Sequence, residues 1–146
     1  MEYVKMTKEH VAAIAELERQ CFSMPWSERS IASELDNPLS LWVVAVAGDA
    51  VAGYVGSQSV MGEADMMNLA VATQYRRTGV GMALVENLIQ ELKAQGITSL
   101  TLEVRVSNAP AISLYEKMDF YQVGRRPGYY RNPLEDALIL RKEWGI

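Results

Sequence analysis

The sequence is poor in the residues that build cross-links and most metal sites, since it has one cysteine and one histidine. The single cysteine, Cys21, excludes an internal disulfide and fits a reducing compartment. Acidic pairs such as Glu63 with Asp65 lack a recognisable metal-binding spacing, so no metal is expected. Long apolar runs are also missing, and Met1–Lys8 lacks the apolar segment of a signal peptide. The expected location is therefore the cytoplasm, with no membrane partner.

Charge and size narrow the protein class further. The net charge is −4, and charged residues make up 22% of the chain against 49% hydrophobic residues. These are ordinary globular values, so disorder is not expected, and the negative charge argues against broad binding of nucleic acid. With 146 residues the chain has room for one hydrophobic core. We expect a single domain over residues 1–146, acting as a monomer.

Apolar residues recur at helix and strand spacing along the chain. Helices are predicted over 7–21, 27–35, 82–95 and 108–118. Strands are predicted over 3–6, 41–47, 51–59, 66–71, 97–104, 120–124 and 137–140, with an irregular loop over 125–136. Strands 41–47, 51–59 and 66–71 read as an antiparallel meander, whereas the helix before 97–104 implies a crossover to a parallel strand. This order predicts a mixed α+β fold.

The stretch from Asn68 to Gly81 combines a buried strand, a glycine turn and the start of a helix. The first N–H groups of a helix have no partner inside it, and the helix dipole places partial positive charge there. Gly79 and Gly81 remove side chains that would keep a ligand off the backbone. Arg76 and Arg77 add positive charge. Together these features indicate a phosphate site.

The common nucleotide motifs do not fit this turn. The lysine of the Walker motif is missing, and residues 79–84 lack the third small residue of the dinucleotide fingerprint. A glycine turn with only a structural role is the alternative. Arg76-x-x-Gly79-x-Gly81 after a strand resembles the pyrophosphate-binding motif of the GCN5-related N-acetyltransferase (GNAT) family, whose members hold acetyl-coenzyme A (acetyl-CoA).

Acetyl transfer from a thioester to an amine requires a base for the amine, donors for the oxyanion and an acid for the departing thiolate. Glu103 is the candidate base because it is the lone acid of an apolar strand; a solvent-facing residue or a partner of Arg105 is the alternative. Tyr115 is the candidate acid, with an aromatic core residue as the alternative. Asn108 can cap the same helix and also contact the cofactor.

Further segments resemble the RimI-type branch of this family, the ribosomal-protein alanine N-acetyltransferases. These segments are Phe22-x-x-Pro25-Trp26-Ser27, Asn68–Val71, Tyr75–Gly81, Leu102–Arg105 with Ser107-Asn108, Ala111–Tyr115, Tyr129-Tyr130 and Glu135–Ala137. The resemblance implies a mostly antiparallel, twisted mixed sheet of about seven strands flanked by about four helices. It also implies acetyl-CoA as cosubstrate and the N-terminal alanine of ribosomal protein bS18 as acceptor, acetylated by direct attack in a ternary complex.

The resemblance also implies roles for individual residues. Glu103 would be the base and Tyr115 the acid, and loops 22–27 and 125–136 would shape the peptide site. The residues implied to line acetyl-CoA are Leu69, Ala70, Val71, Arg77, Thr78, Gly79, Val80, Gly81, Met82 and Asn108. At Asp119 the family usually has glycine, so we expect a left-handed backbone there.

Two alternatives stay open at this point. Another protein N-terminus or a small-molecule amine would use the same cofactor motifs as the ribosomal acceptor. A coenzyme A-binding module without turnover would not need an acid–base pair, so the presence of both Glu103 and Tyr115 argues against it.

Overall fold

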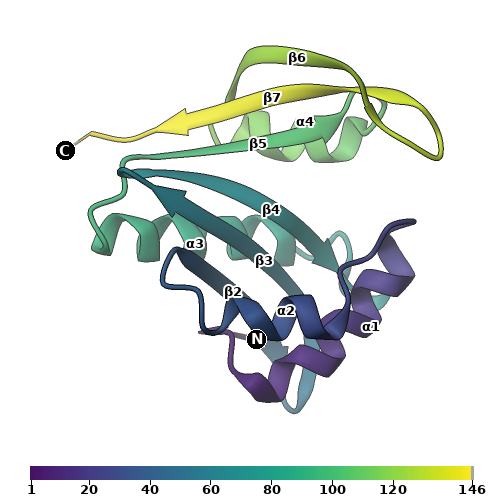
Figure 1. Cartoon of the computed structure of the whole chain (residues 1–146), viewed down its shortest axis with the longest axis vertical. Helices are drawn as coiled ribbons and strands as arrows, with labels where there is room; N and C mark the ends of the chain where they lie inside the picture. The colour runs from purple at the N-terminus through teal and green to yellow at the C-terminus, as the bar shows by residue number, and fades with distance from the viewer. Residues whose placement is uncertain (146) are drawn as a thin grey trace.

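The computed structural model describes residues 1–145, and its elements follow the predicted order (Figure 1). They are β1 (Glu2–Lys5), the 3-10 turn η1 (Lys8–His10), α1 (Val11–Cys21), α2 (Glu28–Glu34), β2 (Ser40–Ala47), β3 (Ala50–Val60), β4 (Glu63–Val71), the 3-10 turn η2 (Thr73–Tyr75), α3 (Val80–Ala94), β5 (Ser99–Arg105), α4 (Ala109–Lys117), β6 (Tyr121–Tyr130) and β7 (Glu135–Glu143). Ile146, the last residue of the predicted domain, lies outside the described residues.

Within residues 1–145, a seven-stranded sheet has the strand order β1-β2-β3-β4-β5-β7-β6. Neighbouring strands run antiparallel except β4 and β5, which are parallel and are connected through α3. The predicted mixed α+β fold with a mostly antiparallel sheet is therefore confirmed.

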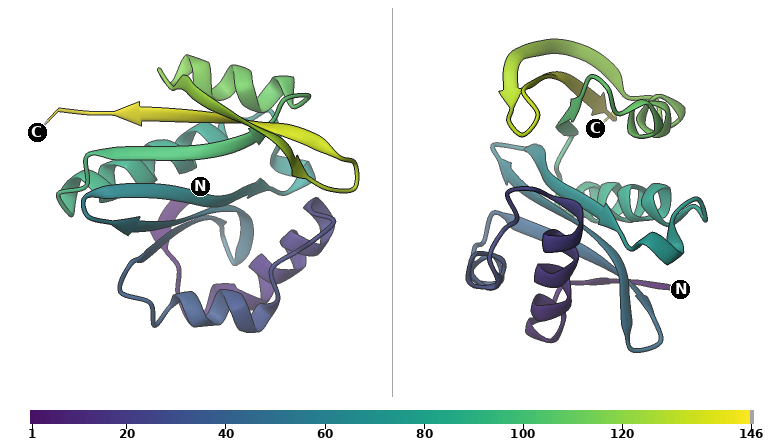
Figure 2. Two further views of the ribbon diagram at one scale, coloured as in Figure 1. Left: turned by 45° about the horizontal axis from the view of Figure 1, so that its top comes forward. Right: turned by 90° about the vertical axis from the view of Figure 1, so that its right-hand side faces the viewer.

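Helices cover both faces of the sheet (Figure 2). Because side chains alternate along a strand, β2 contributes to two cores. Trp42 and Val44 pack with α1 and α2, whereas Val43 and Ala45 pack with α3. A strand buried on both faces has no polar alternation, which explains the continuous apolar run in this part of the sequence.

The sheet opens between its two parallel strands. β4 and β5 pair only over Glu63–Asp65 with Ser99–Thr101. β5 stays paired with β7 from Ser99 to Arg105, and β4 stays paired with β3 up to Val71. Beyond the short parallel pairing, β4 and β5 separate in a V (Figure 1). This splay places a gap in the middle of the molecule.

The prediction of an irregular loop over 125–136 is wrong. β6 continues to Tyr130 and β7 begins at Glu135, so the connection is only residues 131–134. Pro127 and Gly128 lie inside β6 although both residue types are uncommon in strands. β6 is an edge strand, where a missing N–H is tolerated, and its pairing with β7 is interrupted between Arg126 and Tyr130.

Two further observations concern the helices. Asp119 follows the end of α4 with a φ of 69°, which confirms the predicted left-handed conformation. Over residues 1–145, none of the helices is long and apolar enough to cross a membrane.

Candidate active site

A cavity of about 930 Å³ occupies the gap between β4 and β5. Five segments line it: the connection between α1 and α2, the second half of β4, the end of β5, α4, and the connection between β6 and β7. The first and last of these lie far apart in the sequence, and both line the cavity at the splay. The cavity volume is in the range of sites for small organic ligands.

The glycine turn before α3 has the geometry of an anion site. Gly79 has a φ of 85°, in the left-handed region, and the hydroxyl of Thr78 donates to the carbonyl of Tyr75. The N–H of Ala83 donates to the carbonyl of Gly79 at 3.0 Å. The N–H groups of residues 80–82 therefore have no partner inside the helix, and the helix dipole adds positive charge there.

Arg76 and Arg77 differ in their surroundings. Nε of Arg76 donates to the carbonyl of Val71 at 3.0 Å, and its Nη2 lies 3.5 Å from Sγ of Cys21. Arg77 is exposed and has a φ of 63°, an uncommon backbone conformation for a non-glycine residue. The left-handed position at Arg77 was not predicted, because arginine gives no sequence signal for it.

The backbone of β4 presents alternate residues to the gap. Just after the strand, the N–H of Ala72 donates to the carbonyl of Ala52 on β3 at 2.8 Å. By antiparallel alternation, Ala70 also directs its backbone groups to β3, whereas Leu69 and Val71 direct theirs to the opposite side. Among residues 1–145, no strand pairs with that side of β4 beyond the short contact with β5. The gap is therefore lined by an open strand edge.

Glu103 lies on β5 at this cavity, with 28% of its side chain exposed. Its Oε1 is 3.7 Å from Nη2 of Arg126. A hydrogen bond to the Glu103 carboxylate raises the pKa of Tyr129. Burial raises the pKa of Asp65, and the negative charge of Glu103 raises it further. The Glu103 carboxylate thus lies beside an arginine and within electrostatic reach of Asp65, which does not line the cavity.

Tyr115 approaches the same cavity from α4. Only 5% of the residue is exposed, and its hydroxyl lies 3.6 Å from Sδ of Met66 on β4. Burial raises the pKa of Tyr115, so the phenol keeps its proton under ordinary conditions. α4 begins at a cap in which Oδ1 of Asn108 accepts from the N–H of Ala111 at 3.2 Å, which confirms the predicted capping role.

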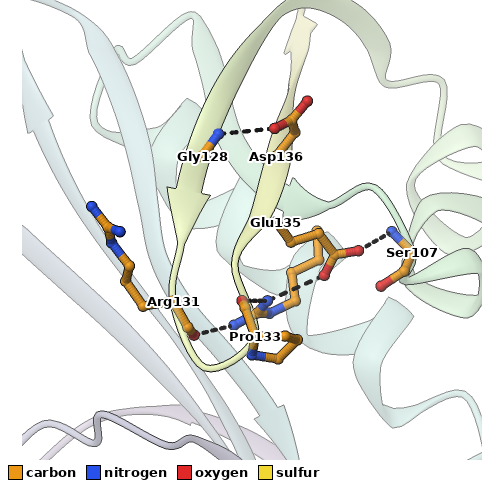
Figure 3. Close-up of polar contacts among 7 residues, drawn as sticks. Ser107, Gly128, Arg131, Pro133, Glu135 and Asp136 are labelled. Atoms are coloured by element: carbon orange, nitrogen blue, oxygen red, sulfur yellow. Dashed lines mark hydrogen bonds and ion pairs between the residues drawn. The ribbon is translucent and has the colours of Figure 1, made fainter.

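Arg105 fixes the connection between β6 and β7 (Figure 3). Its Nη1 donates to the carbonyl of Pro133 at 2.9 Å and to Oε1 of Glu135 at 3.1 Å. Its Nη2 donates to the carbonyl of Arg131 at 2.9 Å. Oε2 of Glu135 in turn accepts from the N–H of Ser107 at 2.9 Å. Arg105 and Glu135 together therefore tie this loop to the turn that precedes α4.

Two adjacent tyrosines end β6 at the cavity. The guanidinium of Arg105 lies 4.5 Å from the ring centre of Tyr130. Burial raises the pKa of Tyr130 to about 12, and the Glu103 carboxylate adds to the effect. The hairpin is closed by Asp136, whose Oδ1 accepts from the N–H of Gly128 at 2.8 Å (Figure 3).

The connection between α1 and α2 is held by Trp26. The centre of its ring lies 5.4 Å from that of Trp42 in an edge-on arrangement, and its backbone N–H donates to the buried carboxylate of Glu18 at 2.8 Å. Ser27 caps α2 at the start of the helix predicted over 27–35, since its hydroxyl accepts from the N–H of Ser30 at 3.1 Å. The loop is therefore an anchored wall of the cavity.

Comparison with known proteins identifies the family. The family model described as the acetyltransferase (GNAT) family matches residues 11–120. This chain belongs to the GNAT family. The [ribosomal protein bS18]-alanine N-acetyltransferase of Escherichia coli (strain K12) is 39% identical to it over 126 residues, 85% of this chain and 84% of that protein. The crystal structure of the ribosomal-protein-S18-alanine N-acetyltransferase from Escherichia coli matches with a TM-score of 0.91 and 34% identity, over 99% of this chain and 94% of that chain.

A more distant structure shares the fold. The crystal structure of Arabidopsis thaliana NAA60 in complex with acetyl-CoA has a TM-score of 0.88 at 18% identity, covering 97% of each chain. The protein described here is a GNAT acetyltransferase, and acetyl-CoA is its cosubstrate.

The predicted site residues of this GNAT acetyltransferase fall in two places. Those that line the cavity are Glu103, Tyr115, Asn108 and Leu69. Ala70 and Val71 continue β4 past the cavity, and residues 77–82 form the turn and helix start beyond it.

Asn68 lines the cavity and donates a hydrogen bond to Glu18, and neither residue was predicted to belong to the site. A signal existed for Glu18, which occupies a core position of α1 at helical spacing from Ile14. An acid on an apolar helix face calls for a partner.

Proposed function

We propose that this chain transfers the acetyl group of acetyl-CoA to the N-terminal alanine amine of ribosomal protein bS18. The observation that carries the proposal is the gap between β4 and β5, which has an anion-type helix start at one end and two anchored loops at the other. The names of relatives at 35–39% identity support the acceptor. This acceptor also supports a cytoplasmic location, where ribosomal proteins are made.

The residues present fit acetyl-CoA. The open edge at Leu69–Val71 can hydrogen-bond the amide groups of an extended pantetheine arm, as a strand would. The helix start within Arg77–Met82 offers N–H groups to a pyrophosphate. Asn108 borders the same gap at the start of α4. When bound there, acetyl-CoA supplies a thioester as the acyl donor.

Three groups of the chain then transfer protons and stabilise negative charge. Glu103 takes a proton from the α-ammonium, so that the nitrogen gains a lone pair and can bond to the acetyl carbon. The N–H of Leu69 donates to the acetyl oxygen while that oxygen carries negative charge. Tyr115 donates its proton to the sulfur as the carbon–sulfur bond breaks, and the second proton that the nitrogen loses on becoming an amide restores the phenol. The transfer is direct, in a ternary complex.

Cys21 does not take part as a nucleophile in this scheme. The side-chain contact of its sulfur is with the Arg76 guanidinium, which is not a base.

An α-amine is a suitable acceptor for a site in which a single carboxylate acts as the base. Its pKa is about 8, whereas that of a lysine side chain is about 10.4, so less proton affinity is needed to generate the free amine.

The proposed unit is one domain over residues 1–146, acting as a monomer. The single sheet that runs from β1 to β6 supports one domain. Size-exclusion chromatography with light scattering tests the oligomeric state. The measured mass should equal that of one chain.

A peptide panel tests the function. The protein is incubated with acetyl-CoA and peptides that differ in their first residue, and acetylated positions are read by mass spectrometry. The proposal expects acetylation at the α-amine of the peptide that begins like bS18, with little at lysines. Acetylation of a polyamine and of no peptide contradicts the acceptor, and the absence of acetyl-CoA binding in calorimetry contradicts the family function itself.

A further inference from the structure

Glu18 joins three elements around the acceptor side of the cavity. It is fully buried on α1, with 0% of the residue exposed. Its Oε1 accepts from the N–H of Trp26 at 2.8 Å, and its Oε2 accepts from Nδ2 of Asn68 on β4 at 2.9 Å. One buried carboxylate therefore connects α1, the loop that follows it and the central strand.

This contact fixes the orientation of the Asn68 amide. An ionised carboxylate only accepts hydrogen bonds, so Asn68 must direct its NH₂ group to Glu18. The other half of the amide, Oδ1, is then directed away from Glu18. Among residues 1–145, no hydrogen bond reaches Oδ1, and Asn68 is a half-buried residue of the cavity wall. A carbonyl oxygen is thus held ready as an acceptor at this wall.

Asn68 and Glu103 belong to the same face of the sheet. Ala70 packs into the core under α1, so Asn68, two positions earlier, shares that face. Leu102 and Val104 pack into the opposite core under α3, so Glu103 between them also faces the α1 side. The amide oxygen and the carboxylate therefore flank the gap from its two strands.

We propose that Asn68 binds the acceptor peptide through Oδ1, which accepts from its first peptide N–H, and that Glu18 is the positioning residue that sets this oxygen. The first peptide N–H is the donor that follows the α-amine along a peptide, and a small amine lacks it. Asn68 thereby selects acceptors with a main chain. This inference rests on the proposed function and names one contact of its acceptor.

Glu18→Gln inverts the amide at little structural cost. The introduced glutamine can still accept from Trp26, but it presents NH₂ to Asn68. Asn68 then satisfies the pair by rotating its amide, which turns its own NH₂ toward the cavity. A purely structural role of the pair survives this rearrangement, because the two side chains stay hydrogen-bonded. Binding of the acceptor does not survive it, because an NH₂ group cannot accept from the peptide N–H. We expect the KM of the acceptor peptide to rise about tenfold, with the KM of acetyl-CoA within twofold of wild type.

The double variant E18Q/N68D reverses the effect. The introduced aspartate accepts from the introduced glutamine through one oxygen and keeps the other oxygen toward the cavity. The acceptor KM should return to within about threefold of wild type. An unchanged acceptor KM in E18Q, or a double variant no better than E18Q, overturns the inference.

Asn68→Ala and a modified substrate give a second test that leaves the Glu18 side chain intact. The probe is an acceptor in which an ester replaces the first peptide bond, so that its N–H is missing. Wild type should prefer the amide over the ester by about tenfold in kcat/KM, and N68A should lose that preference. Equal preference in the two proteins overturns the inference. This test does not use E18Q, so it decides the question even if E18Q no longer unfolds cooperatively.

Glu34 provides the matched control. It is also a buried acid, 8% exposed, and its Oε1 accepts from Ser40, Trp42 and Gln58 away from the cavity. Glu34→Gln should leave the acceptor KM within twofold. The wild-type reaction separates the two proposals. If wild type does not acetylate the peptide, the proposed function is contradicted. If wild type does so and E18Q has an unchanged acceptor KM, only the role of Asn68 is contradicted.

Discussion

The hydroxyl of Tyr115 lies 3.6 Å from Sδ of Met66, and this contact spans the gap between α4 and β4. A thioether is a weak acceptor, so it fixes the direction of the phenol without competing strongly for its proton. Burial raises the pKa of the same phenol. The proton is therefore retained beside the strand edge proposed to hold the thioester.

Tyr115→Phe removes that proton with little change in packing, since only the hydroxyl is lost. We expect kcat to fall about 10²–10⁴-fold because the sulfur then leaves without an acid. Calorimetry should show acetyl-CoA binding close to wild type. Tyr121→Phe is the control, because Tyr121 is exposed on β6 and its hydroxyl meets Glu143. Equal turnover in the two variants contradicts the role of Tyr115.

Glu103→Gln keeps the shape of the side chain and removes its basicity. Turnover should fall about 10²–10⁴-fold at neutral pH, with part of the loss recovered at higher pH, where more of the amine is already unprotonated. Rates across a pH series check this. Glu63→Gln serves as control, since Glu63 lies at the start of β4 and pairs with Arg141 at 2.7 Å. A pH-independent rate ratio between Glu103→Gln and wild type argues against a base.

Arg105→Lys loosens the loop between β6 and β7. Lysine cannot reproduce the forked contacts with the carbonyls of Pro133 and Arg131 and with Glu135. The KM of the peptide should rise several-fold, whereas the affinity for acetyl-CoA, measured by calorimetry, should change little. Because Arg105 and Glu135 act as one unit, adding Glu135→Gln to Arg105→Lys should cost less than the sum of the single effects. Strict additivity counts against this coupling.

The two glycines of the phosphate turn should respond in opposite ways. Gly79→Ala forces a side chain into a φ of 85°, which costs about 1–2 kcal/mol of stability. At Gly81 a new methyl group would meet Leu114 at 3.7 Å and Val71 at 3.8 Å, which are ordinary contacts. Gly81→Ala should therefore keep or raise the melting temperature, because alanine favours a helix by about 1 kcal/mol.

That methyl group also narrows the passage between β4 and α4. Gly81→Ala should weaken acetyl-CoA binding in calorimetry although the fold is intact. Unchanged affinity in this variant would place the cofactor elsewhere.

Stability should depend on pH through Glu18. Burial raises its pKa above the ordinary value of 4.5, opposed by hydrogen bonds from Trp26 and Asn68. The folded state then binds the proton more tightly than the unfolded chain, so stability is lost as pH rises. The free energy of unfolding of wild type minus that of Glu18→Gln should be constant below pH 4.5 and should fall above it until Glu18 is ionised in the folded protein. Urea titrations at several pH values measure this difference, and an increase with pH contradicts the assignment.

Local patterns in the sequence were enough for the order of the elements and for their caps, and they also predict the glycine turn that is proposed to bind the cofactor. The caps at Ser27 and Asn108 and the left-handed Asp119 were all predictable. Each depends on the conformational preferences of a few consecutive residues. The glycine turn belongs to the same class, because its N–H groups are exposed by the start of a helix wherever that helix lies.

The end of the cavity proposed to bind the acceptor depended on tertiary structure. Glu18 meets Asn68 across 50 positions, and Arg105 meets Glu135 across 30. Whether such pairs meet depends on which strands become neighbours and where their pairing stops, and both follow from packing over the whole sheet. The extension of β6 through Pro127 is of the same kind, since it is tolerated only at a sheet edge. The sequence alone thus determined the order of the elements and the glycine turn, because both depend on neighbouring residues. The folded sheet decided the extent of β6 and brought the distant acids, amide and loops together around the gap.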